Sequence, residues 1–128
     1  QMQRLGLTHL NFFGLVASEA AYREGAEWLD QLLDYLQKNV DYTISELGKI
    51  NPKIKVIKPE GTFVLWLDCR ELGIPAEELN NFFVCKARIA FNDGMVFGPS
   101  GYGFQRMNIG CPQVVIAEAM ERLAKALS

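Results

Sequence analysis

Residues that build metal sites and disulfide frameworks are scarce in this sequence. It contains one histidine, His9, and three cysteines, Cys69, Cys85 and Cys111, whose spacings match no CxxC motif. An odd number of widely spaced cysteines argues against a disulfide framework, and the ligands are too scattered for a zinc site. We therefore expect buried free thiols in a reducing compartment, the cytoplasm, and no metal site. His9 has no evident catalytic partner nearby.

Long apolar runs and a strong excess of one charge are also missing. No apolar run approaches the roughly 18 residues of a membrane-spanning helix. The sequence also lacks the charged-then-apolar leader that marks a signal peptide. The net charge of −2 gives no support for nucleic acid or an anionic membrane as partner. A chain of 128 residues, 49% hydrophobic and 22% charged, is long enough for one domain with a modest core.

A helical pattern dominates the first third of the chain, from about Gly14 to Asn39. Its stripe contains Leu15, Tyr22, Ala26, Leu29, Leu33 and Leu36. One helix of this length would exceed about 35 Å, longer than a small domain is wide, so part of the stripe should pack on another domain. Gly25 costs about 1 kcal/mol relative to alanine, so packing must hold the helix there. Thr43 and Glu46 have the spacing of a capping box, which predicts a separate short helix to Ile50.

Strands and helices follow one another in the rest of the chain. We predict strands at 54–58, 62–67, 89–91 and 104–109, turns at 59–61 and 92–94, and helices from Pro75 and from Pro112. Residues 62–67 are nearly all apolar and should lie centrally in the sheet. This order predicts a two-layer α+β domain, with a short, mainly antiparallel or mixed sheet and helices on one face.

A glycine-rich, aromatic loop precedes the last predicted strand, within the stretch 94–112. Side chains alternate along a strand, so Phe104, Arg106 and Asn108 should face one way and Gln105, Met107 and Ile109 the other. Because Met107 and Ile109 are natural core residues, Arg106 should lie on the opposite, open face. A guanidinium fixed there offers a planar fork of donors to a carboxylate or a phosphate. The alternative is a solvated arginine on an edge strand.

Four segments together resemble a known family: residues 20–30 (AAYREGAEWLD), 35–39 (YLQKN), 59–68 (PEGTFVLWLD) and 94–112 (GMVFGPSGYGFQRMNIGCP). They look like the C-terminal part of MalY/PatB-type enzymes. These are pyridoxal-phosphate-dependent C–S β-lyases of the aminotransferase class I/II group, fold type I. The resemblance runs from about residue 9 to the end of the chain.

The resemblance implies that this chain is the small domain of a two-domain, homodimeric enzyme of amino-acid metabolism. Residues 1–13 would be a leader belonging to the large domain, 14–50 a long and a short helix linking the two, and 51–128 the body of the small domain. The full enzyme would release a thiol, pyruvate and ammonia from a cystathionine- or cysteine-type substrate. A class I/II aminotransferase remains an alternative, because transamination shares the first steps.

The resemblance also assigns residues. Arg106 matches the arginine that binds the substrate α-carboxylate, and the loop residues Phe97, Gly98 and Tyr102 would lie near the substrate cleft. The lysine that binds the cofactor would lie in the missing large domain, since no lysine here follows a serine or occupies a buried apolar site. We therefore expect no catalytic and no cofactor-binding residue in this chain, which would be inert alone.

Two hypotheses of other classes remain open. The chain could be a stand-alone α+β module that captures a carboxylate or a phosphate through Arg106. It could also be a structural or dimerisation domain in which Arg106 makes only an internal ion pair.

Overall fold

The computed structural model describes residues 11–128, so His9 and most of the expected leader 1–13 lie outside the described residues. The chain divides into two compact units, residues 1–35 and 36–128. No helix within the described range is long and apolar enough to cross a membrane. The division of the chain into leader, linking helices and small-domain body stays a prediction.

Two helices, not one, occupy the start of the described chain. Helix α1 (Phe12–Glu24) begins after Asn11, whose side chain accepts a hydrogen bond from the Phe13 amide. Helix α2 (Ala26–Ile50) begins after Gly25. A Cβ at Gly25 would lie 2.4 Å from the Ala21 carbonyl oxygen, so only glycine fits this break. The prediction of one continuous helix from Gly14 to Asn39 was wrong, because the backbone uses this glycine to end α1.

The predicted separate helix after Thr43 was also wrong, since α2 runs on to Ile50 without interruption. Thr43 lies inside the helix, where its hydroxyl donates to the Asn39 carbonyl oxygen at 2.7 Å instead of capping a new helix. Asn39 is buried, and its amide donates to the carbonyl oxygens of Ile109 (2.9 Å) and Cys111 (3.0 Å). These bonds tie the second half of α2 to the segment that leaves the sheet.

Within residues 11–128 the sheet has four strands in the order β1-β2-β4-β3, and every neighbouring pair is antiparallel. The strands are β1 (Lys55–Ile57), β2 (Val64–Asp68), β3 (Asn92–Asp93) and β4 (Phe104–Asn108). The central position predicted for residues 62–67 is confirmed by β2, which pairs on both sides.

One predicted strand, at residues 89–91, was wrong, and the turn predicted at 92–94 contains the strand β3 instead. The cause lies at the end of the preceding helix. Arg88 has a positive φ of 56°, and the Ile89 amide donates to the Phe83 carbonyl oxygen at 2.9 Å. Ile89 is buried. Its side chain therefore joins the core, and its amide belongs to the helix end and not to the sheet.

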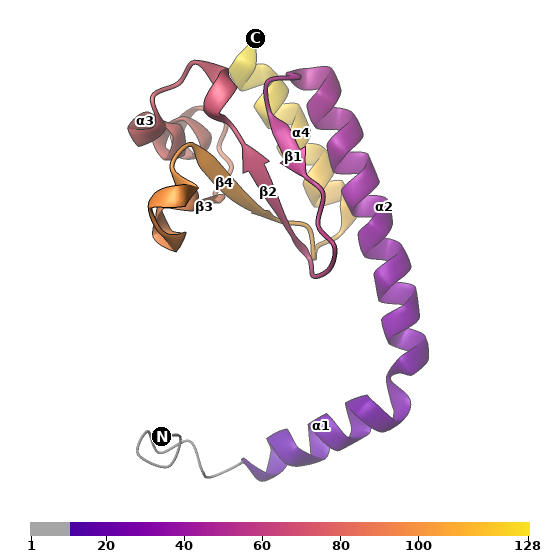
Figure 1. Cartoon of the computed structure of the whole chain (residues 1–128). Helices are drawn as coiled ribbons and strands as arrows, with labels where there is room; N and C mark the ends of the chain where they lie inside the picture. Colours follow the sequence, from indigo (N-terminus) through magenta and orange to yellow (C-terminus); the bar gives the residue numbers. More distant parts are fainter. Residues whose placement is uncertain (1–10) are drawn as a thin grey trace, which may run out of the picture. The chain divides into compact units, whose positions relative to one another are not determined.

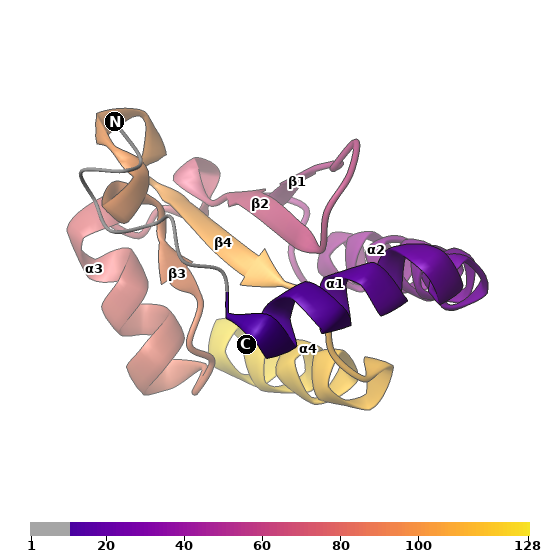
Figure 2. The ribbon, with the colours of Figure 1, turned by 90° about the horizontal axis from the view of Figure 1, so that it is seen from below.

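Helices cover one face of the sheet. Helix α3 (Ala76–Asn81) continues into a π-helical turn (Phe82–Lys86), and α4 (Gln113–Leu127) ends the chain. In Figure 1, α4 lies behind the sheet, and Figure 2 shows the same layering from below. The core between the layers includes Leu65, Leu67, Leu79, Phe83, Met107, Ile109, Ile116, Met120 and Leu123. The predicted two-layer α+β fold is confirmed, and its second sheet face carries the candidate site.

Candidate functional site

The alternation predicted for the last strand is confirmed by β4. Gln105, Met107 and Ile109 are buried on the helix side, whereas Arg106 is half-buried and Asn108 exposed. Arg106 lies between two cross-strand neighbours on the open face, Trp66 of β2 on one side and Asn92 of β3 on the other. The strand register therefore determines which side chains can reach its guanidinium.

Arg106 has neutral partners. Its Nη2 donates to the side-chain oxygen of Asn92 at 2.9 Å, and its guanidinium carbon lies 4.6 Å from the centre of the Phe97 ring. Within residues 11–128, Arg106 forms no ion pair with an aspartate or glutamate. Its side chain is held in place, and the described chain does not neutralise its charge.

The loop that carries Phe97 is folded tightly against itself. It consists of two 3-10 turns, η4 (Gly94–Phe97) and η5 (Pro99–Gly101), and the Asp93 side chain accepts a hydrogen bond from the Met95 amide at 3.0 Å. A Cβ on Gly101 would lie 1.9 Å from the Gly94 carbonyl oxygen. Two glycines are therefore required where the turns touch, and this close approach brings the Phe97 ring to Arg106.

Three aromatic rings join Arg106 to a second arginine across the open face. Trp66 meets Phe97 edge to face, with centroids 5.7 Å apart, and stacks on Phe104 at 5.5 Å with an interplanar angle of 15°. The guanidinium carbon of Arg70 lies 4.8 Å from the Phe104 ring centre. We call Phe97, Trp66 and Phe104 the aromatic row. It has a guanidinium at each end.

Arg70, unlike Arg106, is paired with an acid. Its Nε and Nη2 donate to the two carboxylate oxygens of Asp68, at 2.9 and 2.7 Å, and its backbone amide donates to the same carboxylate at 3.1 Å. The side-chain hydrogen bonds from Arg70 hold the pKa of Asp68 below its ordinary value. The Nε and Nη2 donors of Arg70 are thus used within the chain itself, and its charge has an acid partner.

The predicted loop residues differ in where they lie. Phe97 contacts Arg106, as described above. Gly98 has a φ of 118°, which favours glycine, and it links the two turns. The Tyr102 hydroxyl donates to the Glu77 carboxylate on α3, which raises the pKa of Tyr102 and lowers that of Glu77. The loop is thus attached to α3 as well as to the sheet.

Two residues at the site were not singled out from the sequence. Trp66 was assigned to the central strand only, although its alternation with the buried Leu65 and Leu67 indicates that it faces the open side. Asn92 was assigned to a turn, and no local pattern marks it, because its contact with Arg106 depends on the β3–β4 register.

The three thiols are free, and they differ in exposure. Cys69 is buried, and desolvation raises its pKa to about 12. Cys111 is partly buried, and burial raises its pKa as well. The prediction of a buried thiol was wrong for Cys85, which is exposed at the helix end and donates to the Asn81 side-chain oxygen at 3.0 Å.

The family model described as "Aminotransferase class I and II" matches residues 1–123. The chain belongs to this family. Among curated members it is 37% identical over 127 residues to cystathionine beta-lyase PatB of Bacillus subtilis (strain 168), and 33% identical over 124 residues to protein MalY of Escherichia coli (strain K12). The alignments cover 99% and 97% of this chain but 33% and 32% of those proteins. The chain therefore spans about a third of the length of the curated relatives it matches.

Solved structures of the family have the same fold. A PLP-bound putative aminotransferase from Clostridium difficile 630 matches with a TM-score of 0.92 and 42% sequence identity, over 99% of this chain and 33% of that one. The resemblance to MalY/PatB-type enzymes and the fold expected from it are thus confirmed.

Proposed function

We propose that this chain is the C-terminal, substrate-binding part of a pyridoxal-phosphate-dependent enzyme that cleaves carbon–sulfur bonds in amino acids. The alignment with cystathionine beta-lyase PatB covers 99% of this chain and 33% of PatB, and one similar solved structure, from Clostridium difficile 630, is PLP-bound. The full protein would act on a cystathionine- or cysteine-type substrate and release a thiol, pyruvate and ammonia. Arg106 would bind the α-carboxylate of that substrate.

The observation on which this proposal rests is the state of Arg106. The guanidinium is fixed by Asn92 and Phe97 on the open sheet face, and within the described chain it has no acid partner. A fixed, unneutralised fork suits a carboxylate, which can accept two parallel N–H bonds from it. The internal ion pair that a purely structural role of Arg106 would require is not formed within residues 11–128.

The contribution of this chain to the reaction would be orientation. Two parallel bonds to the α-carboxylate restrict how the bound amino acid can rotate, so its Cα–H bond is presented in one direction. The Phe97 ring and the Asn92 side chain, which both contact the guanidinium, would keep it in this orientation. Pyridoxal phosphate supplies the electron sink for elimination when it is bound.

The described residues do not fit the covalent attachment site of this cofactor. An amine that binds the cofactor needs a lowered pKa, which burial provides. All seven lysines are exposed: Lys38, Lys49, Lys53, Lys55, Lys58, Lys86 and Lys125. We therefore propose that the cofactor is bound by another part of the full protein and that this chain alone has no activity.

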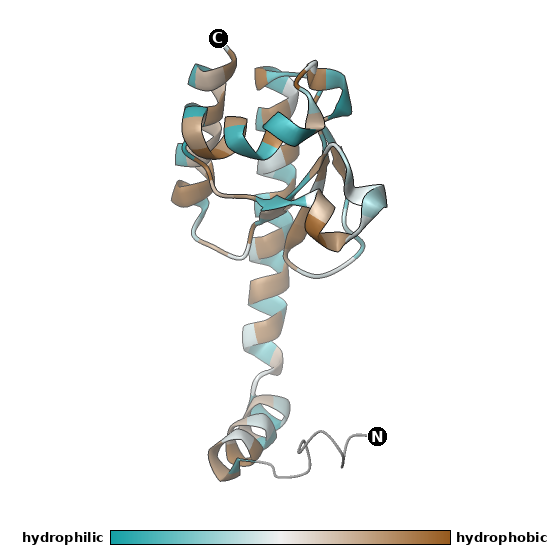
Figure 3. Cartoon of the chain, turned by 90° about the vertical axis from the view of Figure 1, so that its left-hand side faces the viewer, coloured by the Kyte–Doolittle hydropathy of each residue, from teal (hydrophilic) through white to brown (hydrophobic). Residues whose placement is uncertain are grey.

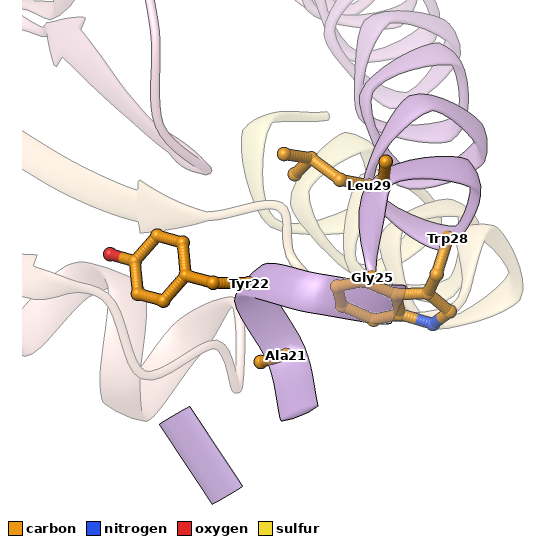
Figure 4. A pocket seen from close by; sticks show the side chains of 6 residues that line it. Ala21, Tyr22, Gly25, Trp28 and Leu29 are labelled. Carbon is orange, nitrogen blue, oxygen red and sulfur yellow. The ribbon is translucent and has the colours of Figure 1, made fainter. Parts of the chain in front are cut away.

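The first unit of the chain supports the presence of a further domain. Its helices expose many large apolar side chains: Phe12, Phe13, Leu15, Val16, Tyr22, Trp28, Leu29 and Leu33. Figure 3 shows apolar stretches along α1 and the start of α2. Figure 4 shows Tyr22, Trp28 and Leu29 around an apolar pocket at the Gly25 break. Patches of this kind are normally covered, and we propose that the large PLP-binding domain covers this one.

We further propose that the full protein is a homodimer, as the family resemblance implies, and that it is cytoplasmic, as expected from its free cysteines. An aminotransferase is the second candidate activity, favoured by the similarity to the putative aminotransferase from Clostridium difficile 630 and by the family itself. Arg106 would have the same role in either enzyme. A stand-alone binding module is less well supported, because the matched relatives are about three times as long as this chain.

The test compares Arg106→Ala with Arg70→Ala in the full-length protein that contains this chain. Both variants remove an arginine from the same sheet face. We expect Arg106→Ala to lower kcat/KM for L-cystathionine by about 10²–10³-fold, since a charged hydrogen-bonded partner is lost. Arg70→Ala should change kcat/KM by less than about threefold. Equal effects of the two changes would contradict the role proposed for Arg106, and pyruvate formation compared with oxo-acid exchange decides between lyase and aminotransferase.

A further inference from the structure

We propose that Asn92 is a positioning residue that orients Arg106 without neutralising it, and that the neutrality of this side chain is what allows the site to bind a carboxylate. This inference rests on the proposed function of Arg106. It concerns a residue that does not itself touch the substrate.

Some N–H donors of the Arg106 guanidinium are bonded within the chain, and others are available to a ligand. Asn92 accepts from Nη2 at 2.9 Å, and the Phe97 ring covers one face of the guanidinium plane. Arginine has five N–H donors. Within the described chain the Nε–H and Nη1–H groups of Arg106 meet no acceptor. One of the two Nη2 hydrogens is thus held by a neutral amide, and the other still forms a parallel pair with a neighbouring N–H that can meet a carboxylate.

The other end of the aromatic row shows what an acid in the same role does. Arg70 also lies against an aromatic ring on this face, but its hydrogen-bond partner is Asp68. The Asp68 carboxylate accepts from Nε and Nη2 in parallel, which occupies one whole edge of the guanidinium, and it neutralises the charge. Asparagine and aspartate have nearly the same shape, so the difference between a closed pair and an open site is one of charge.

The surroundings of Asn92 would tolerate an acid, so folding alone does not require the amide. Asn92 is exposed and lies on β3, which is an edge strand of the sheet. Aspartate there could accept the same bond from Nη2, and the bond would be charge-assisted and stronger. The introduced carboxylate would then compete with the ligand carboxylate for the same fork.

The test measures carboxylate discrimination, which we define as the Kd of ethylamine divided by the Kd of L-alanine for the full-length holoenzyme. The two amines differ by the carboxylate, and neither has a sulfur leaving group, so binding is measured without C–S cleavage. The variants are Asn92→Asp, Asn92→Glu, Asn92→Ala and Arg106→Ala. Asn108→Asp is the matched control. It adds the same charge to the same face, and it can keep the acceptor that Asn108 offers to the Gly110 amide.

We expect Asn92→Asp to lower the discrimination at least about tenfold, and Asn108→Asp by less than about threefold. Asn92→Ala should lower it by a smaller factor than Asn92→Asp, because it loses the bond that orients Arg106 but adds no competing charge. Asn92→Glu should lower the discrimination in the same direction as Asn92→Asp. It therefore tests the same inference if the aspartate variant folds poorly. A merely structural role of Asn92 predicts the reverse order, because aspartate keeps the hydrogen bond that alanine removes.

Two other results would overturn the proposal in distinguishable ways. If Asn92→Asp keeps the discrimination of the unaltered protein while Arg106→Ala loses it, the inference about Asn92 is wrong and the proposed function stands. If Arg106→Ala also keeps the discrimination, the carboxylate is bound elsewhere, and both the inference and the role of Arg106 are wrong.

Discussion

The two ends of the aromatic row contain the same residue type in two different chemical states. At one end Arg70 is held by the carboxylate of Asp68, and at the other Arg106 is held by the amide of Asn92. Each guanidinium lies against a ring of the row. Both arginines thus share the sheet face and an aromatic contact, so neither feature accounts for the different roles that we propose for them. The feature that differs is the charge of the hydrogen-bond partner.

Replacing each arginine with lysine should give the largest difference between the two ends. Lysine keeps the charge but loses the planar fork. We expect Arg106→Lys to lower kcat/KM of the full-length protein about tenfold to hundredfold, because one ammonium cannot make two parallel bonds to a carboxylate. Arg70→Lys should stay within about twofold. Steady-state kinetics with L-cystathionine measures both, and full activity of Arg106→Lys would mean that charge alone is sufficient.

The second largest effect is expected from removing the ring of Trp66, which lies in the middle of the aromatic row, and it should be an effect on stability. Trp66 contacts Phe97 on one side and Phe104 on the other. We expect Trp66→Leu to destabilise the folded state by about 1–3 kcal/mol, since the row loses two ring contacts and part of a half-buried side chain. It should also raise the KM, because Phe97 loses its support. Urea unfolding measures the first effect, and a stability equal to that of the unaltered protein would show that the row contributes nothing.

The Arg70 end should depend on pH. Arg70 lowers the folded-state pKa of Asp68 below the ordinary 3.8, so the pair contributes its full stability above that pH. The contribution is lost as the pH falls through the lowered folded-state pKa, where the carboxylate is protonated. Asp68→Asn should therefore unfold at a slightly lower temperature than the unaltered protein at neutral pH, with a difference that shrinks below pH 3.8. Thermal unfolding across this range gives the comparison, and a difference independent of pH would exclude the ion pair as its cause.

The smallest effect is expected from the hydrogen bond that attaches the glycine-rich loop before β4 to helix α3. The Tyr102 hydroxyl lowers the pKa of Glu77 by donating a hydrogen bond to its carboxylate. In Tyr102→Phe the pKa of Glu77 should return upward toward its ordinary value, as followed by an NMR titration of the Glu77 side chain. No change in that pKa would mean that this hydrogen bond does not persist in solution.

Local patterns were sufficient to predict most of the elements of the fold. The period-2 alternation around Met107 and Ile109 placed Arg106 on the open face, and the nearly all-apolar run at 62–67 placed β2 centrally. These features depend on a few neighbouring residues, and the surrounding fold agrees with them. The break at Gly25 was missed because a glycine within a helical stripe can either be tolerated or end the helix, and its cost of about 1 kcal/mol does not decide between the two.

The partners of Arg106 could be predicted only in part. Phe97 was selected because the family resemblance places its loop near the substrate cleft. The Asn92 contact joins residues 14 positions apart and depends on strand β3, which the sequence pattern placed three residues too early. Strand register and loop closure are set by long-range packing, and a single sequence does not show them.

A crystal structure of the full-length protein with a bound amino acid, such as L-alanine, would test the role of Arg106 most directly. We expect the α-carboxylate to accept two parallel bonds from Arg106 at about 2.7–2.9 Å, with Asn92 still bonded to Nη2 and Arg70 still paired with Asp68. A ligand carboxylate bound by other groups, with Arg106 making no contact to it, would contradict the proposed function.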